Sequence, residues 1–291
     1  MFQLIINIFL SYSIYIIIAI SFSIVYYSTR FFHIAHAVVI TAAAYFSYFF
    51  SRQLGFNLCI AVPLAIMCAT ILGLVMELGI YKPLRKRKAA PLIMLITSLG
   101  LYVVLQNLIS IIWGDNTKNI RTWEVKAGHE IFGAYITDVQ ISIIIISIVI
   151  FIWTLLFIKY SKTGKNIRAL SFNKELSVIF GINANYTILW TFGIGSFLAG
   201  IAGIIVALDT SLAPTMGFNL LLYGVVAMII GGVGSTWGLV GGSLLLATAQ
   251  HLGAYYIDSK WMDAIAYVIL IVFLIWRPLG FSGRQLKKIE I

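Results

Sequence analysis

The residues that could carry chemistry are few, and their spacing matches no catalytic or metal-binding motif. The chain has four histidines, at His33, His36, His129 and His251. None belongs to an HExxH or similar zinc-binding pattern, and no combination of serine, histidine and acid indicates a hydrolase. Gly164 and Lys165 lack the upstream glycine and the following hydroxyl residue of a phosphate-binding P-loop. The sequence therefore predicts no catalytic residue, no metal and no cofactor, and it disfavours an enzyme.

Polar side chains inside apolar stretches are stronger candidates for function. The ones we single out are His33, His36, Thr97, Ser98, Gln106 and Asn107. Because a polar group in hydrocarbon is costly, such side chains usually face the interior of a helix bundle or a substrate pathway. Hydrogen bonds between helices would explain them equally well. We predict that they line a translocation pathway, and both interpretations stay open at this point.

A glycine-rich turn is a further candidate. It reads Gly231, Gly232, Val233, Gly234 and Ser235. Glycines then recur at every fourth position, at Gly238 and Gly242, which places them on one ridge of a helix and favours close packing against a neighbour. Alternatively, the turn is irregular backbone at membrane depth that lines a cavity. On the second interpretation, Gly231, Gly232, Gly234 and Ser235 belong to the pathway.

The polar segment 159–185 is long for a connection between apolar stretches. It contains apolar residues at amphipathic spacing, at Leu170, Leu176, Ile179 and Phe180. One interpretation is a solvated loop on lipid headgroups. The other is a docking helix that fills a partner's groove, with Arg168, Lys174 and Glu175 setting its register.

The amino-acid composition indicates the kind of fold that positions these residues. Of the 291 residues, 61% are hydrophobic and 10% are charged, and the mean hydropathy is +0.99. A soluble domain would carry about a quarter charged residues, so the chain is predicted to be an integral membrane protein. All 20 basic residues lie between the apolar stretches, so the net charge of +10 indicates membrane topology rather than nucleic-acid binding. We treat residues 1–291 as one all-α domain.

A membrane-spanning helix needs about 20 apolar residues, and nine segments are candidates. They are Leu4–Val25, His33–Phe50, Asn57–Gly79, Pro91–Trp113, Val139–Ile158, Tyr186–Leu208, Asn219–Ile230, Trp237–His251 and Met262–Trp276. The seventh and eighth are short, so they form either two tilted spans or a re-entrant hairpin. The second and seventh both open on a polar residue and lead into small residues, which suggests two structural halves.

The charges between the spans predict the orientation. Lysine and arginine concentrate on the cytoplasmic side, which assigns the loop Lys82–Lys88, the segment 159–185 and the C-terminal tail to the cytoplasm. The connection 114–138 carries Lys118, Arg121 and Lys126 against Asp115, Glu124, Glu130 and Asp138. It is therefore predicted to be external, and counting spans backwards places the N-terminus outside as well.

Four blocks of the sequence carry recognisable motifs. The first runs from Glu77 through Tyr81, Pro83 and Arg85 and continues with Thr97, Ser98, Gly100, Gln106, Asn107, Trp113 and Gly114. The second contains Thr163, Gly164, Arg168, Ala169, Glu175, Gly181, Ile182 and Asn183. The third is the run from Gly231 to Gly242, and the fourth is the C-terminal Arg277, Pro278 and Gly280. Together these motifs resemble those of one family, the LivH-type permeases of branched-chain amino acid ABC importers, and the resemblance covers about Ser21 to Gly283. The chain departs from the family at His33–Ala37, where an Asn-Phe-Ala-His-Gly sequence is usual.

The resemblance implies a type II-like ABC importer permease of about eight or nine segments in the bacterial inner membrane. Its expected partners are a second permease subunit, two cytoplasmic ATPases and an external substrate-binding protein. ATPase coupling is then expected at Arg168, Lys174, Glu175, Leu176, Ile179 and Gly181. The cargo would be branched-chain or related amino acids, with urea or short-chain amides as the alternative. An ion-coupled secondary transporter or channel for small polar solutes remains the alternative mechanism.

Overall fold

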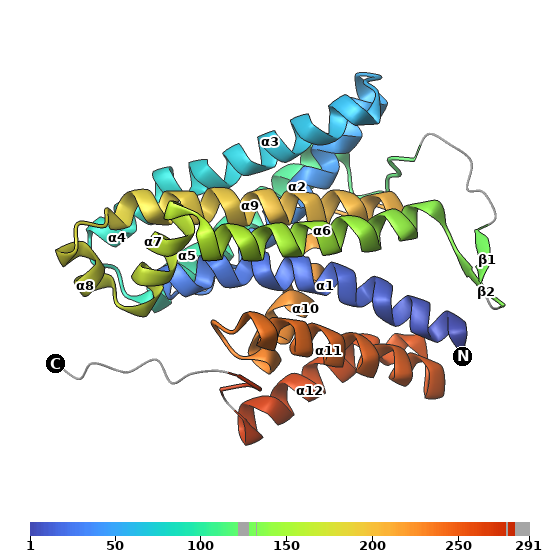
Figure 1. Ribbon diagram of the computed structural model, residues 1–291. Helices are drawn as coiled ribbons and strands as arrows, with labels where there is room; N and C mark the ends of the chain where they lie inside the picture. Colours follow the sequence, from blue (N-terminus) through green and yellow to red (C-terminus); the bar gives the residue numbers. More distant parts are fainter. Residues whose placement is uncertain (122–127, 132, 278, 283–291) are drawn as a thin grey trace.

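The computed structural model describes residues 1–121, 128–131, 133–277 and 279–282. It consists almost entirely of helices (Figure 1). The α-helices are α1 (Phe2–Thr29), α2 (His36–Tyr48), α3 (Leu58–Met76), α4 (Lys82–Lys86), α5 (Pro91–Trp113), α6 (Asp138–Tyr160), α7 (Lys162–Phe172), α8 (Lys174–Ile179), α9 (Ala184–Asp209), α10 (Met216–Gly231), α11 (Thr236–Tyr256) and α12 (Met262–Trp276). Two π-helical segments, Phe49–Gln53 and Glu77–Tyr81, extend α2 and α3, and a 3-10 turn, Ser259–Trp261, precedes α12. The all-α membrane bundle predicted from the sequence is confirmed.

Each of the nine predicted segments coincides with a helix of the described chain. Helical stretches long and apolar enough to cross a membrane are Phe2–Thr29, Leu58–Lys86, Pro91–Trp113, Asp138–Tyr160, Ala184–Asp209 and Ser259–Trp276, with Met216–Gly231 as a shorter apolar helix. The predicted start of the second segment is wrong, because α2 begins at His36 rather than His33. Arg30 ends α1 in the left-handed conformation, with φ of 60°, and the apolar residues that follow return into the bundle without forming a helix. Hydropathy cannot distinguish such residues from a helical turn.

The bundle has two chemically different ends (Figure 1). The first, here called the basic end, carries α4, α7 and α8. The opposite end carries the N-terminus and a short antiparallel hairpin of β1 (His129–Ile131) and β2 (Ala134–Ile136), which the sequence did not predict. The Gln3 side chain accepts a hydrogen bond from the Tyr135 backbone N–H at 2.9 Å and donates one to its carbonyl oxygen at 3.2 Å. The N-terminus and the connection 114–138 therefore share an end, as span counting predicted. Glu124 and Lys126 of that connection lie outside the described residues.

The core is formed by α1 and α9, around which α2 and α10 pack. Small residues allow the backbones to touch. A Cβ on Gly203 of α9 would lie 2.1 Å from the Ile40 carbonyl oxygen of α2, and one on Gly224 of α10 would lie 2.5 Å from the Ile18 side chain of α1. In contrast, α3, α5, α6 and α12 leave many large apolar side chains exposed. Such surfaces match lipid or a neighbouring membrane subunit.

Two helix triplets each have a non-helical segment between their first two helices. In α1–α2–α3 the segment 30–35 joins the first two helices, and in α9–α10–α11 the segment 210–215 does so. Both segments close with the same turn: the N–H of His36 donates to the His33 carbonyl at 3.2 Å, and that of Met216 to the Ala213 carbonyl at 3.1 Å. Because α1 ends at the basic end and α9 ends at the opposite one, the triplets run in opposite directions. Opposite directions are what an inverted pair of structural halves requires, and the two halves suggested by the sequence stay a prediction.

Candidate translocation and coupling sites

A cluster of buried polar side chains surrounds the start of α2. His33 lies in the segment 30–35 and is fully buried. Its Nδ1 is 3.2 Å from the Ser98 hydroxyl of α5 and 3.1 Å from the Tyr81 hydroxyl. Ser98 also accepts a hydrogen bond from the Ala35 N–H at 2.9 Å, so its own proton is free for His33 Nδ1. Two hydroxyl groups converging on Nδ1 favour the tautomer with the His33 proton on Nε2.

His36 takes part in a second chain of hydrogen bonds. Its Nε2 is 2.6 Å from the Ser21 hydroxyl of α1, and Ser21 donates to the Gly195 carbonyl of α9 at 2.9 Å. Since the Ser21 proton is used, His36 Nε2 must be the donor, which leaves Nδ1 as an acceptor. His36 Nδ1 and His33 Nε2 have no hydrogen-bond partner among the described residues. The two rings, 5.5 Å apart, thus carry a buried acceptor and a buried donor without partners.

Aromatic rings close this histidine cluster. Phe192 of α9 lies 5.1 Å from the His33 ring and 5.6 Å from Tyr81. The sequence predicted no functional role for Phe192 or Tyr81, although Tyr81 belongs to the family motif that begins at Glu77. The cluster contains no acid and no activated nucleophile within the described chain, so its chemistry is hydrogen bonding between neutral groups.

The polar residues predicted on α5 separate into two faces. Ser98 points into the histidine cluster, whereas Thr97 and Gln106 are partly exposed and Asn107 is exposed. The Thr97 hydroxyl and the Asn107 amide donate to backbone carbonyls of their own helix, at Ile93 and Val103. The structure therefore does not bring the six predicted polar pathway residues together.

The outward face of α5 is regular. Its members, alternately three and four residues apart, are Ile93, Thr97, Gly100, Val104, Asn107 and Ile111. A Cβ on Gly100 would meet no atom within 4 Å, and Ile111 is 79% exposed. This spacing is typical of a helix that packs along another helix.

The glycine-rich turn lies at the basic end rather than at the middle depth of the bundle, which corrects the expectation from sequence. Gly234, with φ of 86°, packs on the Tyr27 ring near the end of α1, where a Cβ would lie 2.3 Å from a ring carbon. Gly231 and Gly238 press the backbones of α10 and α11 together, since a Cβ on Gly238 would be 2.0 Å from the Gly231 carbonyl oxygen. Gly231 and Gly232 are buried, whereas Gly234 and Ser235 border a surface cleft. The turn therefore serves close packing and lines a cavity.

The predicted coupling segment forms two helices instead of one, because Asn173 interrupts it. The Asn173 side chain accepts from the Leu176 N–H at 3.0 Å and caps α8. Lys174, Glu175, Leu176, Ile179 and Gly181 are all exposed on or just after α8. Leu170, by contrast, is buried on α7, so it does not share the amphipathic face assigned to it. The Arg168 guanidinium lies on a different side, where it donates to the Lys159 carbonyl at 3.1 Å.

An exposed apolar patch therefore covers the tip of the basic end. We call it the α7–α8 patch, and its members are Phe172, Leu176, Val178, Ile179 and Phe180. Phe172 and Phe180 are 84% and 82% exposed. Gly181, with φ of 81°, ends α8 in a conformation that favours glycine. A patch of this kind on a short helix is typical of a docking surface.

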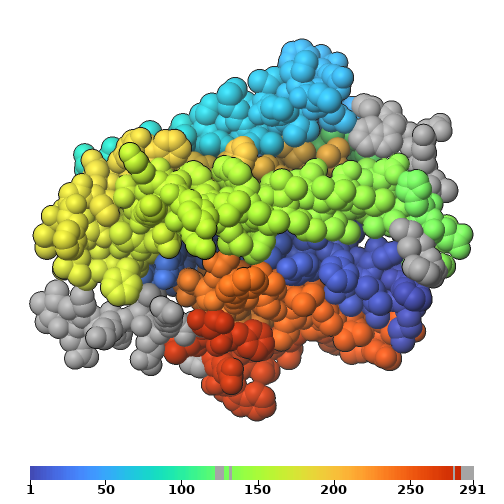
Figure 2. All heavy atoms as spheres, viewed as in Figure 1, coloured from blue at the N-terminus to red at the C-terminus, as the bar shows by residue number. Residues whose placement is uncertain are grey.

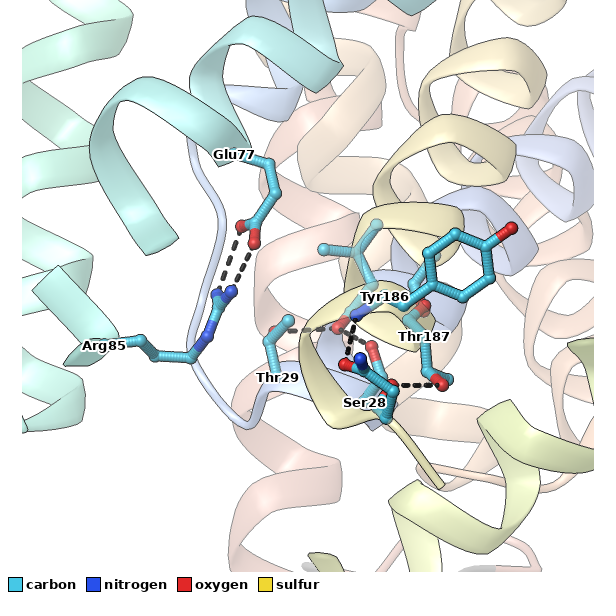
Figure 3. A network of polar contacts seen from close by, with 9 residues as sticks. Ser28, Thr29, Glu77, Arg85, Tyr186 and Thr187 are labelled. Carbon is cyan, nitrogen blue, oxygen red and sulfur yellow. Dashed lines mark hydrogen bonds and ion pairs between the residues drawn. The ribbon is translucent and has the colours of Figure 1, made fainter. Parts of the chain in front are cut away.

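Polar ties hold the basic end to the bundle. Glu77, fully buried, pairs with both terminal nitrogens of Arg85 and so fixes α4 beside α3 (Figure 3). This pair gives Glu77 a structural role. Arg30 donates to the Ser171 carbonyl and ties α7 to the end of α1. Nearby, the Thr187 hydroxyl donates to the Asn183 carbonyl in the first turn of α9 (Figure 3).

Comparisons with known proteins give a consistent result. Residues 4–274 match the family described as the branched-chain amino acid transport system permease component. The chain is 31% identical to the high-affinity branched-chain amino acid transport system permease protein LivH of Escherichia coli K12, over 95% of this chain and 94% of that protein. It is 29% identical to BraD of Pseudomonas aeruginosa over the same shares.

Two further likenesses are more distant. The ribose import permease protein RbsC of Haemophilus influenzae is 32% identical over 50% of this chain and 48% of its own length. Among solved structures, PsaBC from Streptococcus pneumoniae in complex with Fab has a TM-score of 0.52 at 12% identity, covering 94% of this chain and 91% of that one. The last likeness concerns the fold alone.

Proposed function

Because the chain belongs to the family of branched-chain amino acid transport system permease components, we propose that it forms half of a translocation pathway for such amino acids. It is a membrane-spanning permease subunit, and ATP hydrolysis then takes place in separate partner subunits. The observation that carries the proposal is the α7–α8 patch, an exposed apolar surface at the basic end of a membrane bundle. We assign that end to the cytoplasm, and the N-terminus and segment 114–138 to the outside.

The α7–α8 patch is the proposed docking site for a cytoplasmic ATPase. Ile179, 78% exposed, would fill an apolar groove, while Lys174 and Glu175 on the same short helix would set the register. The Glu77–Arg85 pair and the bond from Arg30 to Ser171 stiffen this end. A force applied by ATPase closure would therefore reach α1 and α3, so that two packings of the bundle can alternate. An ATPase pair requires two such surfaces, one on each permease.

The outward face of α5 is the proposed contact with a second permease. Asn107 is exposed among apolar neighbours. Its amide would be costly to place against lipid, whereas a polar pathway or a partner helix could offer it hydrogen bonds. Thr97 and Gln106 border the same helix surface. We assign these three residues to the pathway, with His33, His36 and Ser98 behind α5 as a polar inner wall. The resemblance to LivH-type permeases favours a different chain as the second subunit.

The proposed cargo follows from the relatives. LivH and BraD are named as branched-chain amino acid permeases and cover nearly the whole chain, whereas the ribose permease RbsC covers half of it. An external binding protein would deliver the amino acid at the end that carries the β1–β2 hairpin. Urea and short-chain amides are the substrates to compare.

Co-purification with ATPases from the same genome tests this function. We expect Glu175→Arg combined with Ile179→Asp to abolish ATPase association while the protein stays in the membrane, because both side chains are exposed and contribute little to folding. The matched control is Tyr135→Asp, an exposed aromatic residue at the opposite end, which should leave association unchanged. Equal association in the double variant and the control would overturn the assignment of the α7–α8 patch.

A further inference from the structure

A cleft at the basic end lies apart from the α7–α8 patch and from the histidine cluster. It has a volume of about 690 Å³ and lies between the end of α6, α7, Tyr27 of α1 and the glycine-rich turn before α11. A neighbouring cleft of about 390 Å³ shares Tyr27, Ile158 and Arg168 with it and continues toward Ile20 and Ile24 of α1. The two clefts share lining residues and so form one groove. Figure 2 shows α6 lying across the face of the molecule, with the α10–α11 region on one side of it.

One end of this groove is positively charged. Lys159 at the end of α6 and Arg168 on α7 both line it, and neither forms an ion pair with an acid among the described residues. The Arg168 guanidinium donates a hydrogen bond to the Lys159 backbone carbonyl, so the two basic residues lie next to each other. Two basic side chains on different elements thus border one cleft, and no acid of the described residues neutralises them.

The start of α11 adds hydrogen-bond donors at the same place. The Ser235 side chain caps this 21-residue helix by accepting from the Gly238 N–H at 3.0 Å. The N–H groups of Thr236 and Trp237 donate to no described residue. Free N–H groups and the positive end of the helix dipole both favour an anion, most strongly a phosphate. They supplement the two cations and do not by themselves define the site.

The remaining walls of the groove are apolar. Phe151, Leu155 and Ile158 form a strip along α6 that leads from the charged end toward the middle of the bundle. At the charged end, Trp237 and Tyr160 are 81% and 63% exposed. Tryptophan and tyrosine concentrate at the membrane–water interface, so these rings place the charged end at headgroup depth and the apolar strip within the hydrocarbon.

We propose that the groove binds an acidic phospholipid of the leaflet on the basic side. Its phosphate lies between Lys159, Arg168 and the first turn of α11, and an acyl chain follows Phe151, Leu155 and Ile158. The apolar strip favours a lipid over free phosphate, because inorganic phosphate has no apolar part that could pack against it. Basic pockets between membrane helices on the cytoplasmic side are suited to anionic headgroups. The bound lipid would bridge α7 to the glycine-rich turn, two elements otherwise separate in sequence.

Native mass spectrometry of the full chain in detergent, with phosphatidylglycerol and phosphatidylcholine added at equal concentration, tests the proposal. Wild type is expected to retain phosphatidylglycerol preferentially. Lys159→Glu combined with Arg168→Glu should lower that preference at least about 25-fold, since the loss of each basic side chain near an anionic surface removes a factor of about five and the new carboxylates add repulsion. The matched control is Lys162→Glu combined with Lys165→Glu, which makes the same charge change on exposed positions outside the groove.

Two further measurements distinguish the occupants. Leu155→Trp, which fills the apolar strip without changing charge, should also reduce phosphatidylglycerol retention. Inorganic phosphate at 10 mM, about the upper range of cellular concentrations, should neither raise the melting temperature nor displace the lipid. Equal loss in the charge variant and its control would reduce the effect to general surface charge and overturn the proposal. Stabilisation by inorganic phosphate without lipid preference would overturn it in favour of a free phosphate ligand.

Discussion

The segment 30–35, which leads into α2, and the segment 210–215, which leads into α10, share a backbone course but differ in chemistry. The first places His33 and His36 among the hydroxyl groups of Ser21, Tyr81 and Ser98. The second places Ala213 and Met216 at the corresponding turn positions and packs by backbone contact. The same turn therefore occurs in both regions, whereas in the described chain the histidine cluster lies beside the first of them.

The difference has a physical consequence. A close contact between two backbones leaves no room for an added side-chain atom. A substitution that breaks such a contact therefore lowers the free energy of unfolding. A neutral hydrogen-bond cluster with two unpartnered nitrogens is instead a costly arrangement for a core, since each buried unsatisfied group costs about 1–3 kcal/mol. Stability alone would favour apolar residues there. We infer that the first segment was selected for transport and the second for packing.

The largest expected effect comes from filling the close contact of the second segment. A Cβ on Gly217 would lie 2.1 Å from the Ala37 carbonyl oxygen, so Gly217→Val forces α10 away from α2. We expect a loss of about 3 kcal/mol or more in the free energy of unfolding. Size-exclusion chromatography in detergent should show little monodisperse protein. Gly79→Ala, at a glycine with no atom near its would-be Cβ, is the control. A well-folded Gly217→Val protein would show that the second segment does not depend on close packing.

An intermediate effect is expected at the link between α5 and the first segment. Ser98→Ala removes the acceptor of the buried Ala35 N–H, which costs about 1–3 kcal/mol. Tyr81→Phe leaves His33 Nδ1 with Ser98 as a partner, so it should cost less, about 1 kcal/mol. Thermal unfolding of both variants shows which of the two substitutions is the more destabilising. If Tyr81→Phe were the more destabilising change, the hydrogen bonds around His33 would be assigned wrongly.

The smallest effect on stability, but a large one on transport, is expected at the first residues of α2 and α10. His36→Leu removes a hydrogen bond and also an unpartnered nitrogen, so the change in unfolding free energy should stay below about 1.5 kcal/mol. Uptake by reconstituted vesicles should nevertheless fall about tenfold or more, which is a loss of about 1.4 kcal/mol. Met216→Leu at the equivalent position should change neither quantity. Normal uptake by His36→Leu would make the histidine cluster a packing feature only.

Much of this architecture follows from the sequence, because charge and hydropathy determine which stretches can cross a membrane. Pro91–Trp113 and Met262–Trp276 were predicted to the residue, since a proline starts the first, a glycine follows it and Arg277 follows the second. The backbone course after Arg30 was not predictable. Phe31 and Phe32 are as apolar as helical residues, and their non-helical course depends on tertiary packing.

The sites were predictable in part. The residue types around His33 and Ser98 indicated polar groups at depth, but their separation from Asn107 depends on which way α5 is rotated. The depth of the glycine-rich turn was missed because its contact with Tyr27 lies about 200 residues away in sequence. The division of 159–185 at Asn173 was predictable, since Asn is a preferred N-cap residue whose side chain accepts from the backbone N–H three residues later, here that of Leu176. The tail residues Arg284, Lys287 and Lys288 lie outside the described chain.

ATP hydrolysis by a reconstituted complex tests the central claim most directly. The chain would be combined in lipid vesicles with a second permease, the ATPases and a binding protein from the same genome, and given leucine, isoleucine, valine, other amino acids or urea. We predict that the binding protein loaded with a branched-chain amino acid stimulates hydrolysis and that Glu175→Arg combined with Ile179→Asp abolishes this stimulation. If no ATPase associates and the chain alone moves solute down an ion gradient, the protein is a secondary transporter and the account is wrong.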